Sequence, residues 1–188
     1  RRRVEEALRG TEDNLREAQR LAHLGSWEWN LATGDRLWSD ELYRILGIDR
    51  QNGDNQQDIF TGAVHKDDRQ TVTEALDHAL AGETPAGIDH RIVRHDGTER
   101  FVHSQFEIVV DEHARPNRML ATLHDITDRK HLEERLVHQA FHDPLTGLPN
   151  RALFSNRLEH ALARSRRQAH RQAVLFLDLD HFKLINDT

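Results

Sequence analysis

The chain has 188 residues, of which 31% are charged and 37% hydrophobic, and its formal net charge is −6 at pH 7. This length suffices for one domain and part of a second. Charges of both signs are interspersed and the basic blocks at 1–3 and 164–167 are short, which argues against a nucleic-acid partner. The absence of cysteine excludes disulfides and thiol catalysis and is compatible with a cytoplasmic location.

No apolar run approaches the length of a membrane span or a signal peptide. The arginines at residues 1–3 indicate that the segment begins inside a longer chain. An upstream membrane anchor in the parent protein is therefore left open.

Residues 1–22 are predicted to form an amphipathic helix. Apolar or small residues recur at alternating spacings of four and three, at Val4, Leu8, Thr11, Leu15, Ala18 and Ala22. Thr and Ala at half of these positions make a weak coiled coil, and a helix this short is marginal without a partner. The stripe is either the seam of a homodimer or the face of a lone helix that folds back on its own domain.

The following segment predicts a hairpin and a short helix. Residues 26–31 alternate in polarity, and the turn 32–35 leads to a second strand through Leu37 and Trp38. Ser39 is placed to cap a helix that ends at Gly47. A polar loop is expected over residues 49–57.

One further helix and three strands follow. Residues 67–70, Asp-Asp-Arg-Gln, fit a variant of the capping box, and apolar residues from Val72 to Leu80 form one face before Gly82 ends the helix. Strands are expected over 88–94, 99–110 and 118–126, joined by loops of hairpin composition. The pattern predicts five antiparallel strands around a block of short helices.

This order of elements resembles a PAS domain that closes with a PAC segment. The resemblance rests on residues 21–29, 38–47, 64–69, 91–97 and 125–129, which together span most of residues 21–129. It implies an α+β fold over residues 23–127 and a sensor whose sheet and helices enclose a small-molecule pocket.

The ligand of such a pocket is not specified by the sequence. A cysteinyl flavin adduct is excluded because the chain lacks cysteine. Non-covalent flavin is one alternative, with Trp27, Trp29 and Trp38 either stacking on it or simply forming core. Haem with a histidine axial ligand is another, and no ligand at all is a third.

Residues 128–141 are predicted to form a connector helix with Leu132, Leu136 and Ala140 on one side. In proteins that it resembles, such a helix pairs across a homodimer and passes a change of register or rotation to the output domain. A passive spacer is the alternative.

Residues 142–188 begin with a turn-rich decapeptide, His142 to Arg151. A helix should follow, with five residues facing inward: Leu153, Phe154, Leu158, Leu162 and Ala163. The apolar run 174–177 is expected to be a buried parallel strand that delivers Asp178 and Asp180 to its carboxyl end. These segments resemble the start of an α/β GGDEF domain, the diguanylate cyclase fold.

The resemblance implies roles for five residues. Asp178 would bind Mg²⁺ through its carboxylate and Leu179 through its backbone carbonyl. Phe182 and Lys183 would lie against the triphosphate of GTP, and Asn186 would read the guanine edge. Asp180 is a further strand-end carboxylate.

The Gly-Gly-Asp/Glu-Glu-Phe signature is absent from the chain. We therefore expect no cyclic di-GMP synthesis by this segment itself, and a diguanylate cyclase as its parent. Two alternatives are a parent with a cyclic di-GMP-hydrolysing EAL domain, and a non-catalytic nucleotide-binding relay.

Overall fold

The computed structural model describes residues 2–50, 56–83, 87–168 and 173–178. The chain divides into two compact units, residues 1–132 and 133–188. The first unit contains α1 (Arg2–Leu21), β1 (Leu24–Asn30), β2 (Arg36–Trp38), α2 (Asp40–Leu46), α3 (Gln56–Ala63), α4 (Arg69–Leu80), β3 (Ile88–Val93), β4 (Glu99–Val110) and β5 (Pro116–Asp125). Helix α5 (Thr127–Phe141) crosses from the first unit into the second, which also holds α6 (Arg151–Gln168).

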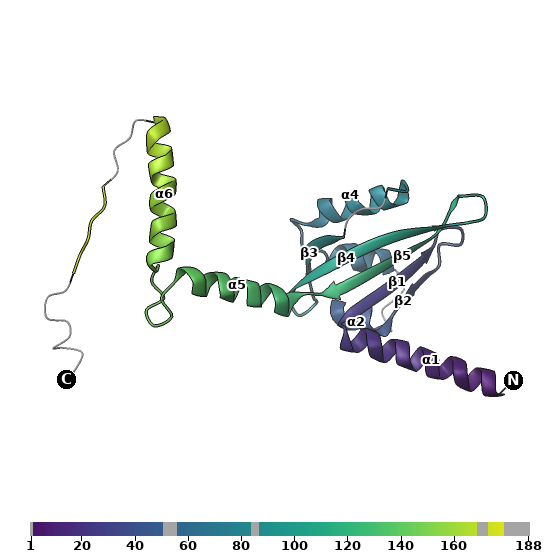
Figure 1. The fold of residues 1–188 in the computed structure, drawn as a ribbon. Helices are drawn as coiled ribbons and strands as arrows, with labels where there is room; N and C mark the ends of the chain where they lie inside the picture. The colour runs from purple at the N-terminus through teal and green to yellow at the C-terminus, as the bar shows by residue number, and fades with distance from the viewer. Residues whose placement is uncertain (1, 51–55, 84–86, 169–172, 179–188) are drawn as a thin grey trace, which may run out of the picture. The chain divides into compact units, whose positions relative to one another are not determined.

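The first unit is built on one antiparallel sheet of five strands in the order β2-β1-β5-β4-β3 (Figure 1). This is the PAS fold that the sequence predicts. The hairpin between β1 and β2 turns at Gly34, whose φ of 80° suits glycine. The chain returns to the centre of the sheet only with β5, so β1 pairs with a strand about ninety residues away in sequence, as in the pair Trp27 and Ala121.

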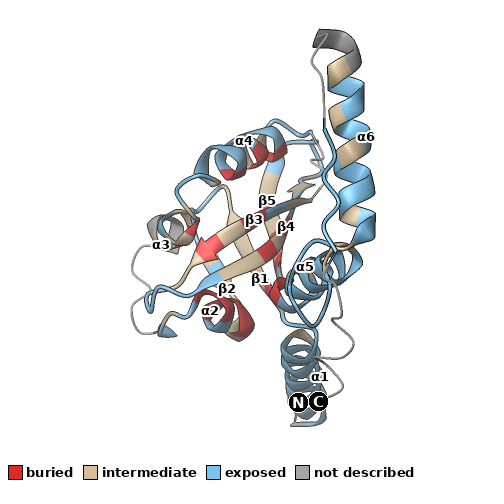
Figure 2. Cartoon of the chain, turned by 90° about the vertical axis from the view of Figure 1, so that its left-hand side faces the viewer, coloured by how far each residue is buried: buried red, intermediate tan, exposed pale blue. Residues whose placement is uncertain are grey.

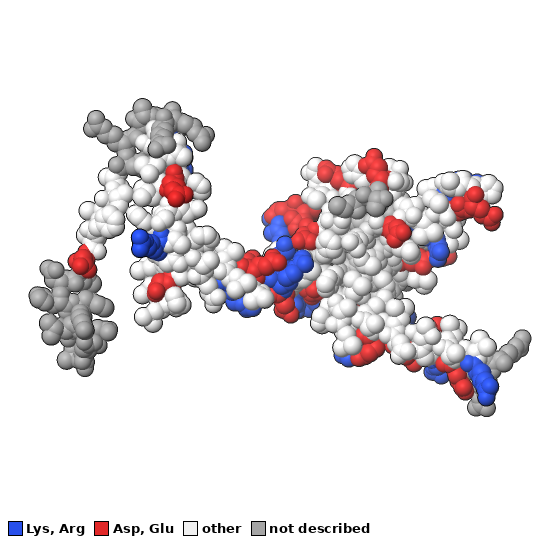
Figure 3. Space-filling model, in the orientation of Figure 1, with Lys and Arg blue, Asp and Glu red and all other residues white. Residues whose placement is uncertain are grey.

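Alternation along the strands places one face of the sheet against the helices. Val102, Ser104 and Phe106 of β4 are buried, as are Met119, Ala121 and Leu123 of β5. Figure 2 shows that the buried residues of α2 and α4 lie on the sides of these helices that face the sheet. Charged side chains of both signs are interspersed over the visible surface of the first unit (Figure 3).

Helix α2 is held at both ends by local interactions. The hydroxyl of Ser39 accepts from the amide of Leu42 at 3.2 Å and from the amide of Ser26 in β1 at 2.9 Å. Gly47 ends the helix with a φ of 69°. Both ends of this helix are as predicted.

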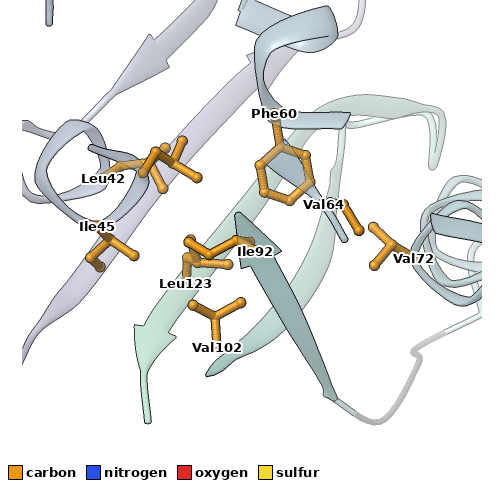
Figure 4. Close-up of a cluster of buried hydrophobic side chains, with 9 residues drawn as sticks. Leu42, Ile45, Phe60, Val64, Val72, Ile92, Val102 and Leu123 are labelled. Carbon is orange, nitrogen blue, oxygen red and sulfur yellow. The ribbon is translucent and has the colours of Figure 1, made fainter. Parts of the chain in front are cut away.

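The main core cluster joins α2, α3 and α4 to the sheet. Its members are Leu42, Ile45, Leu46, Phe60, Val64, Val72, Ile92, Val102 and Leu123 (Figure 4). Leu42 is fully buried, and its replacement by alanine would cost about 2–5 kcal/mol of stability. Gly25 makes this packing possible, because a Cβ there would lie 2.8 Å from the Cα of Leu42.

Two predictions for the helices of this unit are wrong. The polar loop ends before Gln56, where α3 begins, and Phe60 of this helix and Val64 just after it enter the core. The capping box at residues 67–70 does not form, because the Asp68 side chain makes no cap hydrogen bond. That carboxylate is bound instead to Arg91 of β3.

In the second unit, two predictions about packing are wrong. Residues 173–178 form no strand and are exposed, with Phe176 84% and Leu177 87% accessible. A strand needs a partner for its backbone groups, and no described residue pairs with this run. Phe154 and Leu162 of α6 were expected to face inward but are 41% and 46% exposed, and Ala163 is exposed as well. The rings of Phe154 and Phe176 lie edge to face, with centroids 6.3 Å apart.

Candidate functional sites

The residues predicted to bind magnesium and GTP lie mostly outside the described part of the chain. Leu179, Asp180, Phe182, Lys183 and Asn186 are among residues 179–188, which the structure does not describe. Asp178 is described and its side chain is exposed. Among the described residues, no three His, Asp or Glu side chains are grouped so as to hold a metal ion. Of the two predicted metal ligands, Asp178 is the one in the described part of the chain.

The turn that precedes α6 is well defined by its own hydrogen bonds. Asp143 Oδ1 accepts from the amide and the hydroxyl of Thr146, both at 2.9 Å, and these contacts hold the pKa of Asp143 below its usual range. Gly147 adopts a φ of 68°. Asn150 caps α6 through the amide of Leu153 and donates to the carbonyl of Ala140 at 2.9 Å, so one residue joins the end of α5 to the start of α6.

A cavity of about 160 Å³ lies in the first unit between β1, β2 and the helices α3 and α4. Its walls include all three tryptophans of the chain, Trp27, Trp29 and Trp38, together with Phe60. The tryptophans were predicted either to stack on a ligand or to form core. In the structure Trp27 and Trp38 pack against the main core cluster, and Trp27 and Trp29 pack against a second buried cluster around Phe106 and Met119.

Polar groups line one part of this cavity. The guanidinium of Arg36 lies 4.5 Å from the centre of the Trp29 ring, a cation–π arrangement. Asp77 and Thr73 of α4 contribute to the lining as well. The Nε1 atom of Trp29 is buried and has no hydrogen-bond partner among the described residues.

Two further buried polar side chains point to the same face of the sheet. His90 is 3% exposed and Ser104 is 1% exposed, and neither side chain has a hydrogen-bond partner among the described residues. The register sets Ile88 opposite Ser104 and His90 opposite Val102, so His90 and Ser104 are diagonal neighbours. The ring of Phe60 meets His90 edge-on, with centroids 6.4 Å apart.

Burial lowers the pKa of His90 to about 4, and the nearby Ile88 backbone and the carboxylates of Asp68 and Asp89 oppose that shift without cancelling it. His90 is therefore neutral at pH 7. Sequence analysis missed this residue and Arg36, Phe60 and Ser104. The alternation Ile88, His90, Ile92 could have revealed His90 as a polar residue at a core position.

The opposite side of β3 is connected to the connector helix. Asp89 accepts from His103 Nδ1 at 2.7 Å and from Lys130 of α5 at 2.8 Å, and the hydrogen bond from Lys130 is the main reason why the pKa of Asp89 is lowered. Thr127, the first residue of α5, donates to Asp125 and accepts from the amide of Phe101. The base of α5 is thus tied to β3, β4 and β5.

The cofactors considered from the sequence can be compared with this cavity. A pocket for a ligand of drug size holds about 300–1,000 Å³, whereas the cavity measures about 160 Å³. A flavin ring system or a haem does not fit this volume. His90, which is buried, does not line it.

In the described part of the chain, no helix is both long and apolar enough to cross a membrane. Residues 36–123 match the family model described as PAS fold, and residues 140–188 match the model described as diguanylate cyclase, GGDEF domain.

Curated relatives match one or both regions. Diguanylate cyclase DgcM of Escherichia coli is 35% identical over 119 residues, which are 62% of this chain and 27% of that protein. Diguanylate cyclase DgcP of Pseudomonas aeruginosa is 28% identical over 183 residues, which are 97% of this chain and 25% of that protein. The chain thus spans about a quarter of the length of these relatives.

Among solved structures, a sensory box histidine kinase/response regulator from Burkholderia thailandensis matches with a TM-score of 0.52 and 27% identity. The match covers 65% of this chain and 91% of that one. It agrees with the PAS fold of the first unit.

Proposed function

Because the chain combines a PAS domain with the beginning of a GGDEF domain, we propose that it is the sensory and connecting part of a diguanylate cyclase. The parent protein would join two molecules of GTP into cyclic di-GMP under control of the PAS domain. One observation carries this proposal. Helix α5 starts at Thr127, which is bound to the PAS sheet, and ends at Phe141, where the GGDEF match has begun.

The continuous helix supports a mechanical route for the signal. Strand β3 carries His90 on its inner side and Asp89 on its outer side, and Asp89 binds Lys130 of α5. A shift of β3 that follows from events in the core would therefore act on the base of α5. We assign residues 1–22 to the N-terminal helix, 23–127 to the PAS domain, 128–141 to the connector and 142–188 to the first part of the GGDEF domain.

Homodimerisation through the two helices is part of the proposal. On α1, Val4, Leu8 and Leu15 are 71%, 60% and 59% exposed. On α5, Leu132 and Leu136 are 50% and 56% exposed. Apolar rows on exposed helix faces are stabilised when a second helix covers them, and a second copy of the chain would supply that helix.

The chemistry proposed for the GGDEF domain is phosphoryl transfer. A ribose hydroxyl of each GTP attacks the α-phosphorus of the other, so that two phosphodiester bonds form and two pyrophosphates leave. Mg²⁺ would neutralise triphosphate charge during this step. We assign Asp178 and Leu179 to the metal, Phe182 and Lys183 to the triphosphate, and Asn186 to guanine. Since GTP is an intracellular substrate, the proposal places both domains in the cytoplasm.

The test is to incubate the full-length parent protein with Mg²⁺ and either GTP or cyclic di-GMP and to separate the products by chromatography. Cyclic di-GMP formed from GTP supports the proposal. Linear dinucleotide formed from cyclic di-GMP without synthesis would contradict it and would indicate a phosphodiesterase. The latter alternative is not favoured, because the relatives that match across the PAS region, DgcM and DgcP, are named diguanylate cyclases.

A further inference from the structure

We propose that His138 and His142, at the end of α5, together bind one divalent transition-metal ion of the Zn²⁺ class, and that this ion stabilises the last turn of the connector helix. The two residues are four apart in sequence, so their side chains lie on the same face of the helix. Two histidines at this spacing on a helix are a known arrangement for binding zinc.

The two imidazole rings already lie together. They are stacked, with centroids 4.1 Å apart and ring planes within 8° of parallel. Zinc–nitrogen bonds are about 2.0–2.1 Å long, so one ion can join two nitrogens that are up to about 4 Å apart. Because His138 is exposed, its ring can turn about the Cβ–Cγ bond until one nitrogen of each ring points to the same position.

His142 has one nitrogen prepared as a metal ligand. Its Nδ1 atom lies 3.1 Å from the carbonyl oxygen of His138, and a carbonyl oxygen can only accept, so the proton of the neutral ring is on Nδ1. The Nε2 atom then carries the free lone pair. In metal sites the ligating histidine usually donates its other nitrogen to a carboxylate or a backbone carbonyl in the same way.

The backbone around His142 is fixed before any ion binds. The amide of His142 donates to the carbonyl of His138 at 2.9 Å, which closes the last turn of the helix. His142 also forms an antiparallel bridge with Pro149, and the amide of Asn150 donates to the carbonyl of Phe141 at 2.9 Å. A ligand that is held in place in the free protein loses less conformational entropy on binding.

The charges near the pair favour a cation. The carbonyl groups at the end of a helix carry a partial negative charge that stabilises cations there, and the pair spans the last turn of α5, which ends at Phe141. Residues 133–143 contain three acidic side chains and one basic side chain, Arg135. Imidazole nitrogens select Zn²⁺, Ni²⁺ and Cu²⁺, whereas Mg²⁺ prefers oxygen ligands.

The site has two protein ligands, because no third His, Asp or Glu side chain is grouped with the pair in the part of the chain that the structure describes. Structural zinc sites have four protein ligands, so water would complete this site and the ion would exchange with solution. An ion that joins residues four apart requires the helical turn between them and therefore stabilises that turn by linkage. Its regulatory consequence rests on the proposed function, because this turn leads into the GGDEF match, which begins at residue 140.

The experiment titrates the 188-residue chain with Zn²⁺ in excess Mg²⁺ and measures binding by isothermal titration calorimetry. Wild-type protein should bind Zn²⁺ under these conditions. His138→Gln and His142→Gln should each weaken binding by at least about tenfold, because loss of a partner that merely orients a metal-binding histidine already costs 10–100-fold.

His124→Gln is the matched control. His124 is exposed and lies opposite His103 in the register of β4 and β5, so the control removes a histidine from another closely spaced pair. It should leave Zn²⁺ binding unchanged. Circular dichroism checks that each variant is folded.

Hydrogen exchange measures the effect of the ion on the helix. Zn²⁺ should slow exchange of the His142 amide in the wild type and leave it unchanged in His138→Gln. The proposal is overturned if the wild type does not bind Zn²⁺, if binding persists undiminished in folded His138→Gln or His142→Gln, or if His124→Gln weakens it as much. Binding at the pair without slower exchange of this amide would overturn the stabilisation of α5. Cyclic di-GMP synthesis is measured separately on the parent protein with Mg²⁺, so failure of the zinc proposal and failure of the proposed function give different results.

Discussion

The carboxylate of Asp68 accepts three hydrogen bonds from Arg91, two from the guanidinium at 2.9 and 2.7 Å and one from the backbone amide at 2.8 Å. This arrangement joins the start of α4 to β3, next to the buried His90. The side-chain bonds from Arg91 are the main cause of a pKa for Asp68 of about 2. The pair is thus an electrostatic clamp between the helix over the cavity and the strand that contacts α5.

Asp68→Asn should destabilise the PAS unit. The folded state lowers the pKa of Asp68, so the ionised carboxylate stabilises the fold above pH 4, and this contribution is lost as pH falls toward 2. After discounting for solvent screening, we expect a loss of about 1–2 kcal/mol at pH 7. Urea unfolding of both proteins measures it.

Asp67→Asn is the matched control, because the Asp67 side chain is 60% exposed and lies 3.8 Å from Arg91. It should change stability little. An Asp68→Asn protein as stable as the wild type at pH 7, or an equal loss in the two variants, would contradict the role assigned to the Asp68–Arg91 clamp.

His90→Phe should make the PAS unit less sensitive to mild acid. Burial lowers the pKa of His90 to about 4, so between pH 6.5 and 4 the unfolded chain binds a proton that the folded chain does not. The free energy of unfolding of the wild type therefore falls over this range, by about 2 kcal/mol between pH 7 and pH 5. Urea unfolding at these two pH values should show a smaller decrease for the variant.

His124→Phe serves as the comparison, because His124 is exposed and belongs to β5. Its unfolding should keep the pH dependence of the wild type. If His90→Phe retained the full decrease as well, protonation of His90 would not be the cause.

Asp178→Ala in the parent protein should abolish Mg²⁺-dependent turnover of GTP and leave the PAS domain folded. The reason is the loss of a metal-ligating carboxylate. Product chromatography measures turnover, and circular dichroism measures folding. Glu159→Ala, in an exposed position on α6, should keep activity, and undiminished turnover in Asp178→Ala would remove the residue from the metal site.

Leu8→Glu together with Leu15→Glu should weaken dimerisation of the chain. Both leucines lie on the exposed apolar stripe of α1, and a charge at a helix seam must be desolvated when the second copy binds. Sedimentation velocity over a range of concentrations should show more monomer. Arg9→Glu, off the stripe, should sediment like the wild type, and an unaltered profile of the leucine double variant would favour a helix without a dimer role.

Elements whose signals are local were predictable from the sequence. The Ser39 cap acts on Leu42, three residues away, and Gly47 ends the same helix through its own backbone conformation. The long strands β4 and β5 show alternating burial along their length, which follows from the geometry of a strand. The PAS and GGDEF regions could be recognised because their motifs consist of such short segments.

Interactions between distant residues were decided by the tertiary structure. Asp68 has the sequence pattern of a helix cap, but Arg91, 23 residues later, offers its carboxylate three donors including a cation, and charge-assisted bonds are stronger than a cap bond to a neutral amide. The cavity likewise arises only where β1, β2, α3 and α4 meet.

The run Val174 to Leu177 is the clearest case in which a local sequence pattern does not determine the structure. By itself the sequence determined that these residues are apolar and suited to a buried strand, as it determined the Ser39 cap, the end of α2 at Gly47 and the alternation of the long strands. Whether a strand forms depends on backbone partners and a covering layer from elsewhere in the chain, and the described structure pairs no strand with these residues, which are exposed. Burial and strand pairing are properties of contacts between segments, and for that reason only the tertiary structure could decide them.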